Sequence, residues 1–295
     1  MMFLYLTQPA EMHAMPDVKN TQGLYYRHTL PVRIMHWINA IAFFLLLMSG
    51  LQIFNAHPAL HWGRSSYDGR PPLLQMYARQ AGQRNMSGIT QVAGHDFVTT
   101  GVLGASRDAD GTLVERGFPA WATLPGPQWL AMGRRWHLFF AWVLVLNGLA
   151  YLAYAVFSRH LARDLAPDAR DWRSIGTSIR DHLLLRHPQG EAAKRYNVLQ
   201  KLAYLAVIFV LLPLMIVTGW SMSPRLDAVL PGWVDVLGGR QSGRTIHFVV
   251  AWLLFGFVLV HVFEVIVSGF WNHLRSMITG RFSIRAAREG DDAGY

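Results

Sequence analysis

Four long stretches without basic residues set the strongest limit on how this chain of 295 residues can fold. They contain none of its 27 Lys and Arg and only one of its 18 Asp and Glu. A hydrocarbon core of about 30 Å is crossed by roughly 20 apolar residues in an α-helix. Open sheets cannot span lipid, because their edge groups would lack hydrogen-bond partners. The sequence therefore predicts an all-α integral membrane protein, a bundle of four transmembrane helices at 34–54, 136–158, 202–224 and 245–274.

Composition excludes several other classes of protein. Charged residues make up 15% of the chain, against about 25% in ordinary soluble domains. The net charge of +9 could suggest nucleic acid, but basic loop ends are typical of membrane proteins in contact with anionic lipid. We therefore expect membrane lipid and no nucleic acid as a partner. The absence of cysteine excludes disulfides, iron–sulfur clusters, Cys-ligated zinc and covalently attached haem.

The distribution of basic residues predicts the orientation. Of the 27 Lys and Arg, 16 lie in 1–33, 159–201 and 275–295, which favours both termini in the cytoplasm. The first thirty residues lack the basic start, apolar centre and cleavage site of a secretory signal. We expect the first span to be an uncleaved anchor.

Two segments outside the spans are long. Residues 55–133 are rich in Gly and Pro, which predicts an irregular cap on the outer membrane face. Ile175, Ile179 and Leu183 recur at helical spacing among charged residues, which predicts a short interfacial helix on the cytoplasmic side. The predicted organisation is one membrane domain at 1–280, with an outer loop at 55–133 and a polar tail at 281–295.

Four histidines lie within the predicted spans: His36, His137, His247 and His261. An ionisable side chain in a span is costly unless it is paired or ligated, although a single one near a span end can simply bond a neighbouring helix. Because the helices alternate in direction, His36 and His261 share the cytoplasmic depth, and His137 and His247 share the opposite one. His247 and His261 are 14 residues apart, about 21 Å along one helix face. Two layers of two imidazoles are what two stacked haems b require.

Two imidazoles per iron fill both axial positions, so the metal is closed to dioxygen and suited to electron transfer. A single zinc or copper site is the competing use of clustered histidines. It is disfavoured because the ligands divide two and two across the membrane, without a supporting carboxylate at each layer. Basic side chains flank the layers and could pair with haem propionates or with lipid phosphate. These are Arg33, Arg134, Arg135 and Arg244.

Several motifs resemble those of the bacterial cytochrome b561 and nickel-hydrogenase cytochrome b superfamily. They are His36-Trp in the first span, Arg-Arg-Trp-His137 in the second, Arg244-Thr-Ile-His247 with His261 fourteen residues on, and Arg195-Tyr-Asn-Val-Leu-Gln-Lys201 before the third. This superfamily includes the gamma subunit of formate dehydrogenase and anchor subunits of thiosulfate reductase. The resemblance implies a bacterial inner membrane protein with two haems b, one ligated by His36 and His261, the other by His137 and His247. The long 55–133 loop departs from the hydrogenase and formate dehydrogenase members, so their partners are not carried over.

The resemblance also implies a quinone pocket beside the cytoplasmic-side haem. It assigns a quinone contact to Asn197, with Gln200 close by. From the residues alone, Asn197 could equally be the N-cap of the third span. Glu264 lies three residues past His261, and an isolated membrane carboxylate is either a proton carrier for quinone chemistry or a residue that reaches to the interface.

These features predict an electron-transfer subunit of a respiratory chain, not catalytic toward the final substrate by itself. It would connect the quinone pool with a periplasmic redox partner, either a molybdopterin oxidoreductase or a cytochrome. An alternative from the same superfamily is a stand-alone superoxide:quinone oxidoreductase, which would need an open basic funnel at Arg134, Arg135 and Arg244. A haem-free anchor or transporter lacks the paired broken helices typical of transporters. The sequence leaves a homo-oligomer open.

Overall fold

The computed structural model describes residues 23–81, 85–184 and 197–284. Four of its helical segments are long and apolar enough to cross a membrane, which confirms the predicted number of spans. They are Leu30–Phe54 (α1), Leu130–Phe157 (α2), Val198–Ser221 (α5, η4 and α6 together) and Arg240–Val267 (α8).

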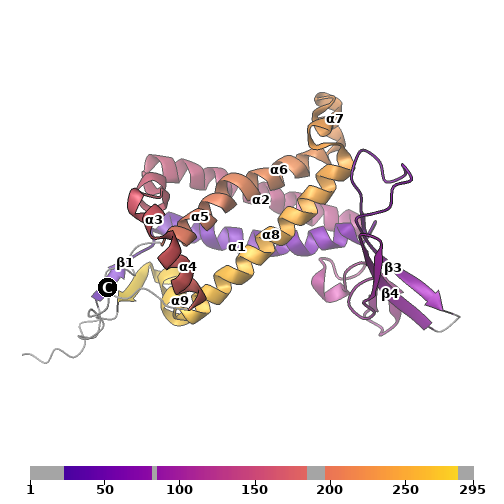
Figure 1. The fold of residues 1–295 in the computed structure, drawn as a ribbon, viewed down its shortest axis with the longest axis horizontal. Coiled ribbons are helices and arrows are strands. Elements are labelled where there is room, and N and C mark those ends of the chain that lie inside the picture. The colour runs from indigo at the N-terminus through magenta and orange to yellow at the C-terminus, as the bar shows by residue number, and fades with distance from the viewer. Residues whose placement is uncertain (1–22, 82–84, 185–196, 285–295) are drawn as a thin grey trace, which may run out of the picture.

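The four spans run lengthwise through the molecule (Figure 1). One end, here called the terminal end, carries strand β1 (Gly23–Tyr26) and helix α9 (Phe270–Thr279). The opposite end, here called the sheet end, carries strands β3 (Leu74–Ala81) and β4 (Asn85–Val92). The two ends therefore have different structures outside the spans.

The third span is continuous but contains a wide turn. Helix α5 (Val198–Ala206) passes through the π-helical segment η4 (Val207–Leu211) into α6 (Leu212–Ser221). Pro213 has no N–H to donate to the carbonyl of the preceding turn, so the α-helical pattern is interrupted just before it. A proline in a membrane helix thus reshapes the span without ending it.

The fourth span is shorter than the sequence predicts. Helix α8 ends at Val267, and Gly269 adopts a left-handed conformation with φ of 113°. A residue with a side chain rarely adopts this φ, whereas glycine does so readily. The chain therefore turns there, and α9 is a separate helix where one span was predicted to continue to Leu274.

The start of the predicted polar tail is also a strand. Residues Arg281–Ile284 form β8, which pairs antiparallel with β1 so that Tyr25 lies opposite Phe282. The prediction of a tail from residue 281 is therefore wrong for 281–284, because backbone pairing with a distant strand stabilises them. Residues 285–295 lie outside the described part.

The spans pack as two pairs, α1 against α2 and α6 against α8. Asn147 of α2 connects the first pair, since its Nδ2 donates to the carbonyl of Met35 at 2.8 Å and to Oδ1 of Asn39 at 2.7 Å. Such interhelical hydrogen bonds join helices in lipid, where the hydrophobic effect does not. In the second pair Gly243 lies directly against Ser221, with no room for a Cβ.

The predicted interfacial helix is present as α4 (Ile175–Leu183), preceded by α3 (Ala169–Arg173). Lys201 of α5 forms a salt bridge of 2.8 Å with Asp171 of α3, which connects these helices to the third span. The other short helices are η1 (Ala120–Ala122), η2 (Leu161–Leu165), α7 (Pro224–Val229) and η5 (Trp233–Leu237).

The loop at 55–133 is not irregular, in contrast to the prediction. Its strands form a four-stranded antiparallel sheet in the order β2-β3-β4-β5 and a separate hairpin. Short strands among Gly and Pro turns show little periodicity in sequence, yet Met76 and Ile89 are buried within this sheet. The further strands are β2 (Ala59–Leu60), β5 (His95–Val98), β6 (Ala105–Arg107) and β7 (Leu113–Glu115).

The amide side chain of Asn55, at the end of α1, holds the loop through two hydrogen bonds. Asn55 accepts a hydrogen bond from the backbone N–H of Phe118 at 2.6 Å and donates to the Phe118 carbonyl at 3.0 Å. Phe118 packs in a core cluster with Leu51, Phe54 and Met76. The loop thus packs on the helix bundle through both polar and apolar contacts.

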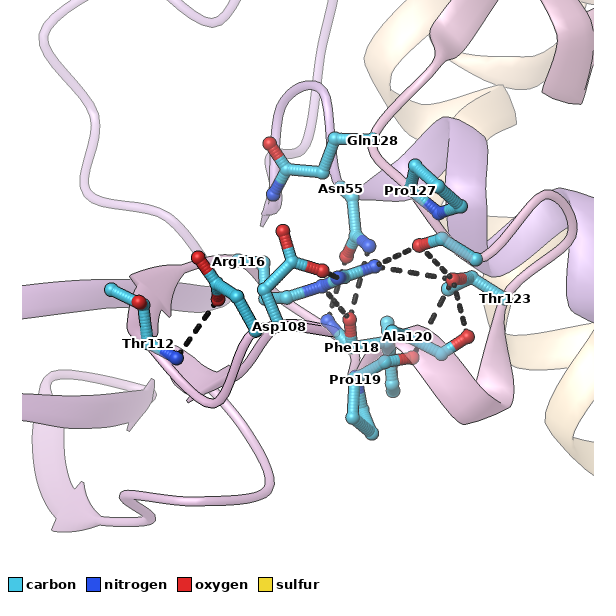
Figure 2. A network of polar contacts seen from close by, with 12 residues as sticks. Asn55, Asp108, Thr112, Arg116, Phe118, Pro119, Ala120, Thr123, Pro127 and Gln128 are labelled. Carbon is cyan, nitrogen blue, oxygen red and sulfur yellow. Dashed lines mark hydrogen bonds and ion pairs between the residues drawn. The ribbon is translucent and has the colours of Figure 1, made fainter.

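A buried cation organises the same region (Figure 2). The Arg116 side chain has no exposed surface. It donates to the carbonyls of Phe118 at 2.8 Å and Gly126 at 2.9 Å, and to the Thr123 hydroxyl at 3.2 Å. The carboxylate of Asp108 lies 3.9 Å away. A buried charge is tolerated only when it is paired and hydrogen-bonded. These contacts supply both, and they join Arg116 to the loop residues Asp108, Phe118, Thr123 and Gly126.

We expect Asn55→Ala to lower the free energy of unfolding by about 2 kcal/mol, because both backbone groups of Phe118 would lose a buried partner. Thermal unfolding of the purified protein in detergent measures the change. Gln128→Ala is the matched control, since this exposed amide makes one hydrogen bond, to the Glu115 carbonyl. Equal melting temperatures for the two variants would contradict the assigned role of Asn55.

Candidate functional site

The structure brings the four membrane histidines together as two pairs. At the terminal end, His36 of α1 and His261 of α8 have ring centroids 6.3 Å apart at an interplanar angle of 61°. At the sheet end, His137 of α2 and His247 of α8 have ring centroids 6.2 Å apart at 64°. These are the pairs that the sequence predicts from depth in the membrane.

The spacing within each pair fits two ligands on opposite sides of one metal ion. A metal–imidazole bond is about 2 Å, and a five-membered ring has its centroid about 1.2 Å from each atom, so the centroids would be about 6.4 Å apart. The observed 6.3 and 6.2 Å agree with this distance. Within the described residues no hydrogen bond joins the two rings of either pair. The rings therefore fit the two axial positions of haem iron.

Hydrogen bonds orient the His137 ring. Its Nδ1 lies 3.1 Å from the Leu46 carbonyl and 3.2 Å from the Ser49 hydroxyl, both on α1. A carbonyl only accepts, so Nδ1 carries the proton and the lone pair is on Nε2. Such a bond fixes the tautomer and orientation of a metal-binding imidazole.

The His247 ring is held in the same way by α6. Its Nδ1 lies 3.1 Å from the Met215 carbonyl and 3.0 Å from the Thr218 hydroxyl. Helices α1 and α6 thus hold the two rings of this pair from opposite sides. Neither helix supplies a ligand at the sheet end.

A glycine follows each of these hydroxyl residues and lies against the imidazole. A Cβ added at Gly50 would be 3.3 Å from Cε1 of His137, and one at Gly219 would be 3.4 Å from Cε1 of His247. Sequence reasoning missed the roles of Ser49, Thr218 and Gly219. The detectable signal is the repeat of a hydroxyl residue followed by glycine near the same end of two spans.

The pair at the terminal end has different surroundings. His261 is stacked on Phe257, with centroids 6.1 Å apart at 16°, and His36 is in edge contact with Trp37 at 5.6 Å. Just before α1, burial lowers the pKa of His28 to about 4, and the charges of Arg27 and of nearby histidines, His36 first, add to this effect. Ring packing therefore takes the place of the hydrogen bonds found at the sheet end.

The predicted propionate partners differ in their contacts. Arg33 donates through Nη2 to the Ile278 carbonyl of α9, and its buried Nε has no partner among the described residues. Arg244 donates to the His57 carbonyl, and its guanidinium carbon lies 5.4 Å from the Phe54 ring centroid. The other two, Arg134 and Arg135, are exposed on the first two turns of α2. Pairing with propionates stays a prediction for all four.

The three residues predicted to contact quinone lie at the start of α5 and near the end of α8. Asn197 is the N-cap of α5, where its Oδ1 accepts from the Gln200 N–H at 2.9 Å and Gln200 Oε1 accepts from the Asn197 N–H at 3.3 Å. This reciprocal capping box is the structural alternative that the sequence left open. Glu264 is half-buried on the last turn of α8 and forms no ion pair within the described chain. Contact of these three residues with quinone stays a prediction.

We expect Gly50→Val and Gly219→Val each to lower the haem content per chain. The added methyl groups would displace the imidazole that lies against the glycine. Pyridine haemochrome absorbance per chain measures the content. Gly256→Val is the control, because an added Cβ there meets nothing within 4 Å. Residue 256 lies about two and a half turns after His247, on the opposite face of α8. Wild-type haem content in both test variants would contradict the packing role.

Comparison with known proteins agrees with this geometry. Residues 27–280 match the family model described as prokaryotic cytochrome b561. The putative protein-methionine-sulfoxide reductase subunit YedZ1 of Azospira oryzae is 24% identical over 242 residues, which cover 82% of this chain and 91% of that protein. The family match includes all four spans and all four membrane histidines. The chain therefore belongs to the prokaryotic cytochrome b561 family, whose members are multi-pass membrane proteins that bind haem b.

Proposed function

We propose that this protein is a di-haem b electron-transfer subunit that passes electrons between the quinone pool and a periplasmic redox partner. The observation that carries the proposal is the presence of two facing imidazole pairs, one towards each end of the bundle. One pair would serve each face of the membrane. A chain of two redox centres can then connect a lipid-soluble carrier with a water-soluble protein.

Bound haem supplies a one-electron iron couple, whose potential the protein tunes through axial ligands and burial. The chain's own residues place each imidazole, and each pair would hold one haem and leave no position for another ligand. His247 and His261 share α8 and are 14 residues apart, so this helix separates the two layers by about 21 Å. A haem held in this way would offer a substrate no metal position, which supports electron transfer to another protein and not catalysis on this chain.

The terminal end is proposed to face the cytoplasm, and the sheet end the periplasm, of a bacterial inner membrane. The excess of Lys and Arg in 1–33, 159–201 and 275–295 supports this orientation. Quinone would then react beside His36 and His261, at the cytoplasmic side. The redox partner would dock on the sheet end.

The relative YedZ1 is named as a subunit of a putative protein-methionine-sulfoxide reductase. By analogy, the partner of this chain would be a reductase, and electrons would flow outwards from quinol to that enzyme. A molybdopterin oxidoreductase or a cytochrome would suit the same role. The final substrate is reduced on the partner and not on this chain.

The superoxide:quinone oxidoreductase alternative receives no support from the contacts of its proposed funnel. Arg244 donates to the His57 carbonyl and lies over the Phe54 ring, so its guanidinium is held by the end of α1 and the residues that follow it. Arg134 and Arg135 are exposed.

We expect His137→Leu and His261→Leu each to lower the haem content from two per chain to one, because each removes one axial ligand. Pyridine haemochrome absorbance per purified chain is the measurement. His95→Leu is the control, since His95 is an exposed residue of β5. Two haems per chain in either test variant would refute the ligand assignment.

Electron transfer across the bilayer can be followed in lipid vesicles sorted by a tag inserted after Asp110, an exposed residue at the sheet end. Decylubiquinol is the donor, and ferricyanide, which does not cross lipid, is the acceptor at the sheet end. We expect His137→Leu to slow ferricyanide reduction at least tenfold while quinol still reduces the remaining haem. His95→Leu should match the wild type. If decylubiquinol does not reduce the haem of the wild-type protein, the proposed function is wrong.

A further inference from the structure

Three basic side chains gather at the sheet end of the bundle. Arg244 of α8 donates a hydrogen bond to the His57 carbonyl, and its guanidinium carbon lies 5.4 Å from the centroid of the Phe54 ring. The rings of His57 and His61 are stacked, with centroids 6.0 Å apart at an interplanar angle of 17°. We call Arg244, His57 and His61 the basic cluster.

The basic cluster lies about one helical turn beyond the imidazole pair of His137 and His247. On α8, Arg244 precedes His247 by three residues. On α1, Phe54 lies under the guanidinium group and follows Gly50 by four residues, and Gly50 lies against the His137 ring. Each of these steps is about 5 Å along a helix. Two helices therefore place the guanidinium between the imidazole pair and the folded loop.

The guanidinium of Arg244 has no acidic partner within the part of the chain that the structure describes. The one hydrogen bond described for it uses Nη2, and a guanidinium has five N–H donors. Arg240, one turn earlier on α8, instead forms a salt bridge of 3.0 Å with Asp227. Arg244 thus keeps several donors for an acceptor from outside the described residues.

The two histidines of the basic cluster also lack a counter-charge. His61 is 8% exposed, and its buried Nδ1 has no hydrogen-bond partner among the described residues. Burial lowers the pKa of His57, and the nearby charges of Arg244 and His61 lower it further. Because basic groups that repel one another and leave buried donors unpaired are costly, a bound anion would stabilise them.

The cofactor that the imidazole pair fits supplies such an anion. Haem b carries two propionate carboxylates on one edge of its macrocycle, and a guanidinium pairs with a carboxylate through two parallel hydrogen bonds. Lipid phosphate is the competing partner for a basic side chain at a span end. The burial of His61 favours the haem, because Thr245 donates to the His61 carbonyl at 2.7 Å and holds this residue against α8.

We propose that the basic cluster binds the propionates of the haem held by His137 and His247, with Arg244 and His61 as the donors and His57 stacked on His61. This inference rests on the proposed function. We call this haem the sheet-end haem. The loop at 55–133 would then complete a cofactor site in addition to presenting a surface to the redox partner.

The basic cluster would also affect the potential of the sheet-end haem. Negative propionates stabilise the ferric state, and cations that neutralise them raise the reduction potential. The cluster therefore favours electron transfer towards the sheet end.

Redox titration of the purified protein tests the site. We expect Arg244→Gln and His61→Phe each to lower the midpoint potential of one haem, or to lose that haem, while the other is unchanged. The affected haem should be the one that His137→Leu removes. Arg240→Gln is the matched control, because it removes a paired cation one turn away on the same helix. Equal shifts in Arg244→Gln and Arg240→Gln would indicate a general effect of charge and overturn the site.

A vibrational measurement reports on the carboxylates themselves. In His261→Leu the sheet-end haem alone is expected to remain, and its propionate bending band can be followed by resonance Raman spectroscopy. Adding Arg244→Gln or His61→Phe to this variant should shift the band, and adding Arg244→Lys, which keeps the charge, should shift it less than Arg244→Gln. An unchanged band in both Arg244→Gln and His61→Phe would overturn the site.

The lipid alternative has its own signature. Native mass spectrometry would then show an anionic phospholipid that the wild type retains and Arg244→Gln loses. That result, with an unchanged propionate band, would identify a lipid site and overturn the proposal.

The outcomes separate this inference from the proposed function. If the wild type does not bind two haems, the proposed function itself fails. If it binds two and neither potential responds to Arg244→Gln or His61→Phe, only the assignment of the basic cluster fails. A selective shift in Arg134→Gln or Arg135→Gln would then place the propionates at the exposed arginines of α2.

Discussion

The hydrogen bonds from two imidazole Nδ1 atoms to backbone carbonyls are the interactions on which the candidate site depends. At the sheet end, Leu46 accepts from His137 and Met215 accepts from His247. Each bond leaves the Nε2 lone pair free for a metal. The carbonyls belong to α1 and α6, so the orientation of the rings is set by helices that contribute no imidazole to this pair. A change in the packing of α1 or α6 would therefore reorient the rings.

Helix α8 gives one imidazole to each pair and so couples the two ends of the bundle. His261 pairs with α1, and His247 pairs with α2. The spans otherwise pack as α1 with α2 and as α6 with α8. The imidazole pairs thus bridge two separate helix pairs, and a macrocycle between the rings would bridge them in the same way. Cofactor binding and assembly of the bundle are therefore physically linked.

The two ends of the protein expose different kinds of surface. At the sheet end, Asn55 and Arg116 fix a folded loop against the bundle, which gives a water-soluble partner an ordered surface. At the terminal end, apolar side chains of α1 and α9 line an open groove together with Arg33. An ordered polar surface suits protein docking, and an apolar groove suits a carrier that diffuses in the bilayer.

Much of this arrangement could be predicted from the sequence, because the physics of the bilayer is local. Charge is excluded from a span and apolar length is fixed by membrane thickness, so four helices and the depth of each histidine follow directly. The strands within 55–133 could not be predicted, because they are short and lie among Gly and Pro turns, so their sequence shows little periodicity. Strand β8 could not be predicted because its partner β1 is distant in sequence. The turn at Gly269 was missed because it lies inside a continuous apolar run.

The sequence by itself determined the membrane class, the four spans and which histidines share a depth. Only the tertiary structure decided that His36 meets His261 and that His137 meets His247 at a distance suited to one metal ion. It also decided that Ser49 and Thr218 hold the rings at the sheet end. Depth is a property of position along one helix, whereas contact depends on the rotation and packing of two, and no local pattern encodes that.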